Sequence, residues 1–360
     1  MLVLVAAAGC GRIGFDSLAD GDGDGSVSAA SCNRPLKVVQ ASAQFPRLAG
    51  LSTPTRIGAA WIADDGTIAS GGATIAPDDR LTDPISGTLL AGPAPYTAVS
   101  VASNGTTAIG AGAVNGTTII SMSDATTLQP VASDLTLLAA IGGAHAATAI
   151  TATTGTRYAL YVVDSTDNTG LAGIDGSNQL SGGVGEGFQD SYLGIAALNG
   201  RLLAVSVSTD SATCELISVA ADFQSSGLLV TFGGAGCRQP IMAQAPGRTD
   251  FLLINFDIAM DTSFQRIAMD NAGVITMGPD TEIGGGNEPR IVATTSGYWV
   301  LVHFSGHIRA KHLTFAGVVD RDLDVATVAD DSTHDVVIHN GEPYAVWLAD
   351  GLFFEHLCVN

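Results

Sequence analysis

The amino-acid sequence predicts an all-β protein built from repeated units of four short antiparallel strands. Charged residues make up 14% of the chain, against roughly 25% in an ordinary globular protein, while small and strand-forming residues are abundant. A turn glycine followed by an apolar strand recurs every 44 to 50 residues. These glycines are Gly105, Gly155, Gly200, Gly247, Gly297 and Gly341. Such regular spacing predicts a repeat architecture, in which each unit buries its apolar face against its neighbours.

The first residues, "MLVLVAAAGC", run from an apolar stretch through small residues to Cys10. This order resembles the end of a bacterial lipoprotein signal. The resemblance implies that residues 1–9 are a truncated signal segment whose start lies upstream, and that Cys10 becomes the lipidated first residue. It also implies an exported protein, anchored to a bacterial membrane by lipid and facing the periplasm or the cell surface. A β-strand followed by a free cysteine is the alternative interpretation.

Residues 10–33 have the composition of a flexible acidic tether, because Gly, Ser and Asp dominate them and leave little to bury. Asp20, Asp22 and Asp24 match the opening of a calcium-binding loop, but Ser31 stands where such a loop places a bidentate Glu. We expect a solvated linker, with calcium at these aspartates as the alternative. No other cofactor is predicted.

The repeat units have a common internal order after residue 34. An apolar strand precedes each glycine, and a second, third and fourth strand follow, separated by turns such as Asp65-Gly66 and Asp350-Gly351 that favour positive φ. One unit before Gly105 lie Pro54 and Thr55, which gives seven units. This pattern resembles a β-propeller, without the signature of a named propeller subfamily. The resemblance implies seven four-stranded blades over residues 34–360, with six or eight blades as the alternatives.

The two ends of the chain share a phrase, "WIADDGTIA" from Trp61 and "WLADGLFFE" from Trp347. The phrase places both tryptophans in the second strand of their units, so the last unit ends after its third strand. The segment 34–42, "RPLKVVQAS", has strand character. We therefore expect it to pair with that third strand and to close the ring, which hides two strand edges.

Closure would also bring Cys32 close to Cys358, while Cys214 and Cys237 lie in one repeat unit. With Cys10 assigned to lipid, the five cysteines predict two disulfides, Cys32–Cys358 and Cys214–Cys237, and hence an oxidising compartment. Buried free thiols are the alternative.

The charge of the chain narrows the class of partner. Its formal net charge is −20, its pI is about 4.4, and its only lysines are Lys37 and Lys311. Such a chain repels phosphate backbones and anionic lipid surfaces, so we expect no nucleic-acid partner and no membrane contact except through the lipid anchor. No apolar run approaches the ~18 residues of a membrane span. The sequence contains no nucleophile-elbow, zinc-protease or P-loop motif.

Three of the seven histidines lie close together, at His303, His307 and His312. If Ser305-Gly306 turns a hairpin, Phe304 pairs with His307 and His303 pairs with Ile308. His303 and His307 then point to opposite faces of the sheet and cannot share a metal ion, so we predict no metal site.

The connections between blades are the predicted place for a ligand site. In a propeller they surround one mouth of the central channel, so equivalent residues of successive blades converge there. Mixed acidic, basic and aromatic residues occupy this position, as a ligand site requires. The predicted rim is Tyr96, His145, Asp190, Arg238, Glu288, Arg290 and His334. Arg290 either pairs with Glu288 or holds an anionic ligand; solvated loop ends are the alternative reading of the whole set.

These observations predict a non-catalytic binding module at the cell envelope, with a protein, a glycan or another envelope component as its partner. A polysaccharide hydrolase or lyase is one alternative; it would use Asp190 and Glu288, provided that these carboxylates face each other across about 5 to 10 Å. A purely structural surface protein is the other alternative.

Overall fold

The structure is a computed structural model, and all described residues lie in one compact unit, Cys32–Asn360. It describes residues 35–39, 48–76, 81–92, 94–115, 117–131, 133–137, 145–152, 158–164, 168–175, 177, 179–198, 201–208, 213–220, 226–232, 237–256, 261–270, 272–329 and 333–358. Regular secondary structure within these ranges consists of β-strands alone. Among the same residues, no helix is long and apolar enough to cross a membrane.

The strands form antiparallel sheets in which each strand pairs with the next one along the chain. The first sheet contains β2 (Leu48–Ser52), β3 (Ile57–Ile62), β4 (Ile68–Ile75) and β5 (Leu81–Leu90). The second contains β6 (Ala98–Ser103), β7 (Thr107–Val114), β8 (Thr117–Asp124) and β9 (Leu135–Leu137). The third contains β10 (His145–Ala152), β11 (Tyr158–Asp164), β12 (Asn168–Ile174), β13 (Leu180–Leu198), β14 (Arg201–Ser208), β15 (Cys214–Ala220) and β16 (Ser226–Phe232).

The remaining sheets follow the same order. The fourth contains β17 (Arg238–Gln244), β18 (Asp250–Phe256), β19 (Asp261–Met269) and β20 (Ile275–Met277), and β21 (Thr281–Gly285) also pairs with β19. The fifth contains β22 (Asn287–Ala293), β23 (Gly297–Phe304), β24 (His307–Thr314) and β25 (Val319–Thr327). The last contains β26 (Thr333–His339), β27 (Glu342–Leu348), β28 (Leu352–His356) and β1 (Leu36–Val39).

The blade count differs from the prediction, because the strands form six sheets and not seven. The difference arises at β13, a strand of 19 residues. Its first half, Leu180 to Gln189, pairs with β12, and its second half, Asp190 to Leu198, pairs with β14. The repeat predicted two separate strands here, the last strand of one blade and the first strand of the next. One uninterrupted strand takes both positions, so the eight strands expected for two blades form a single seven-stranded sheet.

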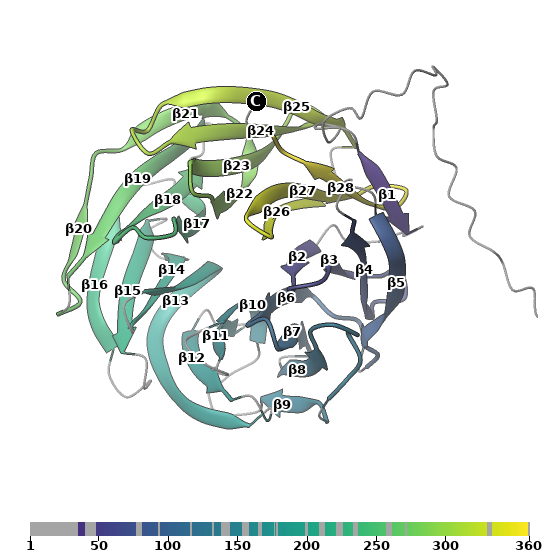
Figure 1. Cartoon of the computed structure of the whole chain (residues 1–360). Coiled ribbons are helices and arrows are strands. Elements are labelled where there is room, and N and C mark those ends of the chain that lie inside the picture. Colours follow the sequence, from purple (N-terminus) through teal and green to yellow (C-terminus); the bar gives the residue numbers. More distant parts are fainter. Residues whose placement is uncertain are drawn as a thin grey trace, which may run out of the picture. The chain divides into compact units, whose positions relative to one another are not determined.

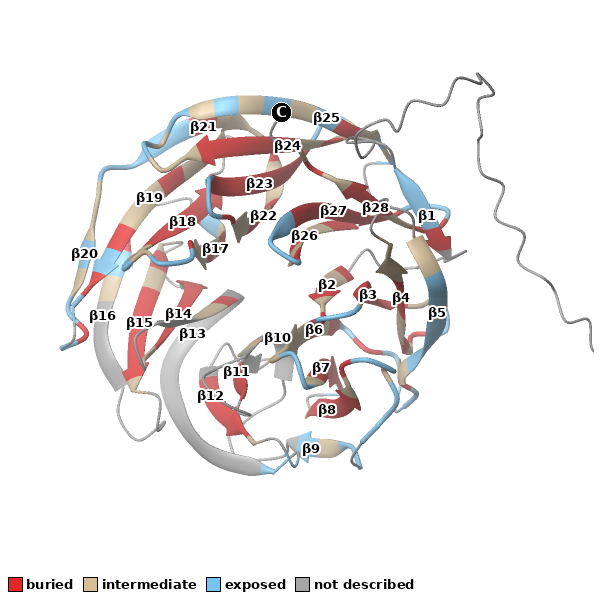
Figure 2. Ribbon diagram, viewed as in Figure 1, coloured by how far each residue is buried: buried red, intermediate tan, exposed pale blue. Residues whose placement is uncertain are grey.

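The sheets lie around a common centre (Figure 1), and each has one strand nearest to it except the seven-stranded third sheet, which has two, β10 and β13. The inner strands contact their neighbours in the order β2, β6, β10, β13, β17, β22 and β26, and β26 in turn contacts β2. Figure 2 shows that middle strands such as β23 and β27 are buried, whereas the outermost strands β5 and β25 are largely exposed. The core therefore lies between the sheets, where apolar side chains of facing strands interlock.

The two ends of the described chain meet in the last sheet. β1 pairs antiparallel with β28, with Leu36 opposite Phe354, so the expected pairing of segment 34–42 with the third strand of the last unit is confirmed for β1. Trp61 lies in β3 and Trp347 in β27, the second strands of their units, as predicted. Buried side chains of both ends, Trp61 and Val346 among them, share one core cluster.

One predicted disulfide is confirmed. Cys214 and Cys237 are bonded, with their Cα atoms 5.6 Å apart, and both are buried in the core. Cys358 is disulfide-bonded as well. Cys10 and Cys32 lie outside the described residues, as do Asp20, Asp22 and Asp24, so the Cys32–Cys358 pairing and the calcium alternative stay predictions.

The contact between β2 and β26 predicts a strong effect of one added methyl group. A Cβ on Gly50 would overlap Cγ1 of Val337 and approach the carboxylate of Asp335 to 3.3 Å. Val337 is β-branched and buried in the cluster that joins the two ends, so it has little room to rotate. We expect Gly50→Ala to lower the free energy of unfolding by about 1 to 3 kcal/mol in urea titrations. Gly87→Ala is the matched control, because a Cβ there meets no atom within 4 Å; equal stability of the two variants would contradict this view of the junction.

Candidate functional site

Four of the seven inner strands, β10, β13, β17 and β22, contain a β-bulge, and a predicted rim residue lies at each of them. The register shifts next to His145 in β10, next to Asp190 in β13, next to Arg238 in β17, and across Glu288 in β22. These four positions therefore share a local backbone irregularity. Bulges bend a strand and change the direction of its side chains, which is why they are common beside functional sites.

Two of these bulges share a local cause. Gln239 and Glu288 have φ angles of 44° and 50°, in the left-handed region that residues other than glycine rarely adopt. Each is followed by a proline, Pro240 or Pro289, which has no N–H to donate to the ladder. The lost donor and the left-handed residue together place the extra residue of the bulge at the start of the strand.

The bulge of β22 places Arg290 beside Asp335 of β26. Nε of Arg290 lies 4.0 Å from Oδ1 of Asp335, and its side chain is 29% exposed. One terminal nitrogen donates to the carbonyl of Pro289 at 3.0 Å. The guanidinium is thus held by a long ion pair to β26 and a local hydrogen bond to its own strand.

Asp335 itself is more firmly held. Its Oδ2 accepts the amide of Gly50 in β2 at 2.7 Å, and its Oδ1 accepts its neighbour Val336 at 2.8 Å. Burial raises the pKa of Asp335 above its ordinary value, while Arg290 and the two amides act in the opposite direction. The three inner strands β22, β26 and β2 therefore meet in one cluster of an arginine, a carboxyl group and backbone amides.

The other predicted rim residues do not all reach solvent. Tyr96 is 2% exposed in the core between the first and second sheets, where its hydroxyl donates to the carbonyl of Gly92 and burial raises its pKa to about 12. His334 is 1% exposed and lies opposite Trp347. Arg238 is exposed and Glu288 is half-buried. The side chains of His145 and Asp190 lie outside the described set, so the separation of Asp190 from Glu288 stays untested.

The burial of His334 and Tyr96 corrects the expectation that spacing alone identifies rim side chains. Because side chains alternate along a strand, the residue after His334 points the other way, and this residue, Asp335, is the one that meets Arg290. The sequence signal was present in the pair His334-Asp335, but only the position of the neighbouring sheets decides which of the two pairs with Arg290.

The predicted hairpin of the histidine-rich segment is confirmed. His303 pairs with Ile308 and Phe304 with His307, around a turn in which Ser305 and Gly306 both have positive φ. His303 is 7% exposed, whereas the side chain of His307 is 40% exposed and contacts Asp324. Within the part of the chain that the structure describes, no three metal-ligating side chains gather in one place.

A small apolar cavity lies between the first two sheets. Leu51, Ala59, Leu89, Val101 and Ile109 are among the residues that line it. Its volume is about 10 Å³, which holds little more than one water-sized group. It is therefore a packing gap between sheets and offers no room for a substrate.

Comparisons with known proteins identify the fold. No protein-family model matches the chain, and no curated protein matches its sequence. Among solved structures, Kuenenia stuttgartiensis hydrazine synthase superposes with a TM-score of 0.62 at 9% identity, over 90% of this chain and 99% of that one. The β-propeller domain of Myceliophteria thermophila Cps50 (Swd1) gives 0.59 at 7% identity, over 89% and 99%. BBS1N, in its complex with ARL6DN, gives 0.58 at 8% identity, over 91% and 96%. At these identities the likeness concerns the fold alone, and the fold is a β-propeller.

The burial of His334 predicts a pH dependence of stability. Burial, with smaller contributions from Arg290 and His303, lowers the pKa of His334 from 6.5 to about 3. Between these pH values the unfolded chain binds a proton that the folded protein does not, so the free energy of unfolding falls as the pH drops below 6.5. From pH 7 to pH 5 this amounts to about 2 kcal/mol. Over this pH range, His334→Gln should lose about 2 kcal/mol less stability than the wild type in urea titrations, and equal losses in the two proteins would refute the assignment.

Proposed function

We propose that this protein is an exported binding module, held at a bacterial cell envelope by acylation of Cys10. Its propeller binds a protein or glycan partner at the beginning of the inner strands β22 and β26, where Arg290 and Asp335 lie. The observation that carries the proposal is Arg290. It is a half-buried guanidinium in a protein of net charge −20, and its Nε lies 4.0 Å from the carboxylate of Asp335.

The chemistry of Arg290 indicates the kind of group that it binds. A guanidinium presents five N–H donors in a planar fork that matches a carboxylate or a phosphate. The donor on Nη1 is used by Pro289 and Nε faces Asp335. In a strongly acidic protein, a polyanion is repelled at long range, so the favoured ligand is a single anionic group on an otherwise neutral partner, such as an acidic sugar of a glycan.

The compartment is supported by the cysteines. The Cys214–Cys237 bond and the disulfide-bonded state of Cys358 are typical of proteins in an oxidising, exported environment. A binding role is also consistent with one structural neighbour, BBS1N, which is in complex with a protein, ARL6DN. The propeller supplies a rigid platform, and the inner strand ends supply the groups that contact a partner.

Acylation of Cys10 predicts a specific chemical label. In bacterial cells that make the chain and are fed an alkyne-bearing fatty acid, the wild type should be labelled and recovered with membranes. Cys10→Ala should lose the label and be released from the membrane fraction, because only the lipid holds it there. Cys32→Ala is the matched control and should keep the label. Labelling that persists in Cys10→Ala would contradict the anchor.

Binding through Arg290 predicts a charge-selective thermal shift. Titration of the full chain with an oligosaccharide that carries one uronic acid on otherwise neutral sugars should raise the melting temperature, since a ligand at about 100 times its Kd adds roughly 2.7 kcal/mol of stability. A neutral glycan of equal length should give a smaller shift. Arg290→Ala should weaken binding by about tenfold or more, the usual cost of a charged hydrogen bond.

Arg309→Ala is the matched control for this experiment, because Arg309 lies on the outer part of the fifth sheet and pairs with Asp322. It should bind like the wild type. If neither glycan shifts the melting temperature, or if both arginine variants bind equally well, the inner strand ends are not the binding site for such a ligand.

A further inference from the structure

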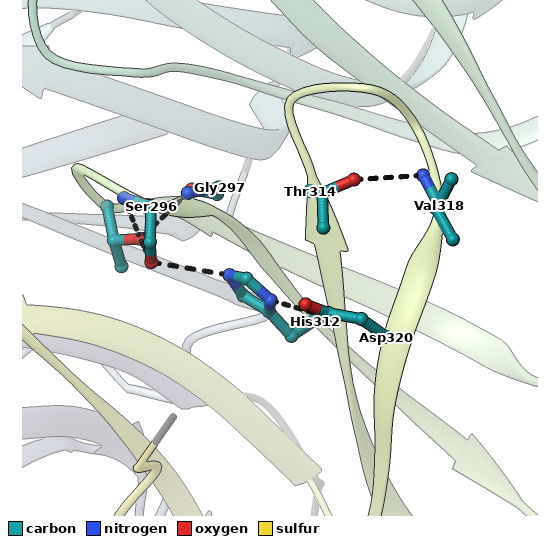
Figure 3. Close-up of polar contacts among 7 residues, drawn as sticks. Ser296, Gly297, His312, Thr314, Val318 and Asp320 are labelled. Atoms are coloured by element: carbon teal, nitrogen blue, oxygen red, sulfur yellow. Dashed lines mark hydrogen bonds and ion pairs between the residues drawn. The ribbon is translucent and has the colours of Figure 1, made fainter. Parts of the chain in front are cut away.

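A second polar cluster lies on the fifth sheet, away from Arg290. It consists of Ser296 in the turn between β22 and β23, His312 in β24, and Asp320 in β25, and Figure 3 shows the three side chains in a row. Oγ of Ser296 lies 3.4 Å from Nε2 of His312, and Nδ1 of His312 lies 2.6 Å from Oδ1 of Asp320. The two ring nitrogens thus have different partners, a hydroxyl on one side and a carboxylate on the other.

This pattern determines the direction of the hydrogen bonds. A carboxylate only accepts, so Nδ1 of His312 carries the hydrogen that it donates to Asp320. In the neutral ring Nε2 is then an acceptor, and the hydroxyl of Ser296 lies within reach to donate to it, in competition with Oγ1 of Thr294. An imidazole oriented by a carboxylate and bonded to a serine hydroxyl has the arrangement by which a weak nucleophile is activated.

The packing around His312 holds the ring in this orientation. The residue is 2% exposed, and the ring of Trp299, its cross-strand partner, lies 5.1 Å away between centroids. A Cβ on Gly297 would stand 2.8 Å from Nε2 of His312 and would overlap the carbonyl of Leu313. Glycine at 297, one of the glycines that mark the repeat, therefore lets the turn approach the imidazole.

The turn presents Ser296 to solvent while Thr294 holds its backbone. Oγ1 of Thr294 accepts the amides of Ser296 and Gly297, each at 3.2 Å, and lies 3.0 Å from Oγ of Ser296. Thr294 is buried, whereas Ser296 is exposed. A reagent can therefore reach the hydroxyl although its base is enclosed.

We propose that Ser296 is an activated nucleophile, with His312 as its general base and Asp320 as the residue that positions His312, and that the group attacked is the carbonyl of a small carboxylic ester. Oγ of Ser296 forms a bond to the acyl carbon as its proton passes to Nε2 of His312. The ester C–O bond breaks, the leaving alcohol takes that proton, and an acyl-serine remains. Water then attacks the acyl-serine, its proton passes through His312 back to Ser296, and the carboxylic acid departs.

The test is covalent labelling of the full chain with a fluorophosphonate probe, in which the serine oxygen displaces fluoride from phosphorus. Peptide mapping should find the label on Ser296, and Ser296→Ala should abolish it at this site. Asp320→Asn and His312→Gln should slow the labelling by about a hundredfold or more, the usual contribution of a general base. Hydrolysis of p-nitrophenyl acetate should fall in parallel.

The matched control is Thr295→Ala, an exposed substitution in the same turn, which should label like the wild type. Asp320 is exposed at the edge of the sheet, so Asp320→Asn keeps the test valid even where His312→Gln fails to fold. No label on Ser296, or equal labelling rates in the wild type and in Asp320→Asn, would overturn the proposal and leave the three residues as a link between the turn and the outer strands.

Discussion

The hydrogen bond from the amide of Gly50 to the carboxyl of Asp335 joins residues that are 285 positions apart, and much of the structure depends on the junction that it marks. β2 is the first inner strand and β26 the last, so this bond joins the first sheet to the last one. Ser52 and His339 form a second bond across the same boundary, at 3.2 Å. Buried backbone donors require such partners, and here the last sheet supplies them to the first.

The same junction explains why Asp335 is tied to Arg290. A carboxyl group that caps a neighbouring sheet has to lie deep between strands, and burial then opposes its charge. The guanidinium of Arg290 offsets this cost in part, yet at 4.0 Å it is far from an optimal pair. The arrangement leaves an arginine that contributes to the packing of two sheets while only two of its three nitrogens have the contacts described above.

The two polar clusters differ in how the fold builds them. Arg290 and Asp335 come from the inner strands of different sheets, so their meeting depends on contacts between sheets. Ser296, His312 and Asp320 belong to one sheet and meet through strand pairing and a turn, where Gly297 permits the close approach. The outer cluster is therefore local in origin, whereas the inner one exists only when the first and last parts of the chain come together.

By itself, the sequence determined the repeat, the order of strands within each unit, the pairing of β1 with β28, the Cys214–Cys237 disulfide and the hairpin at Ser305-Gly306, because period and turn chemistry are local properties of the chain. The tertiary structure decided that β13 runs uninterrupted through two strand positions, so that six sheets form and not seven. It also decided that His334 and Tyr96 are buried while Asp335 meets Arg290, and that His312 stands between Ser296 and Asp320. The physical reason is that a bulge changes which way a side chain points, and that burial depends on neighbouring sheets whose residues lie far away in the sequence.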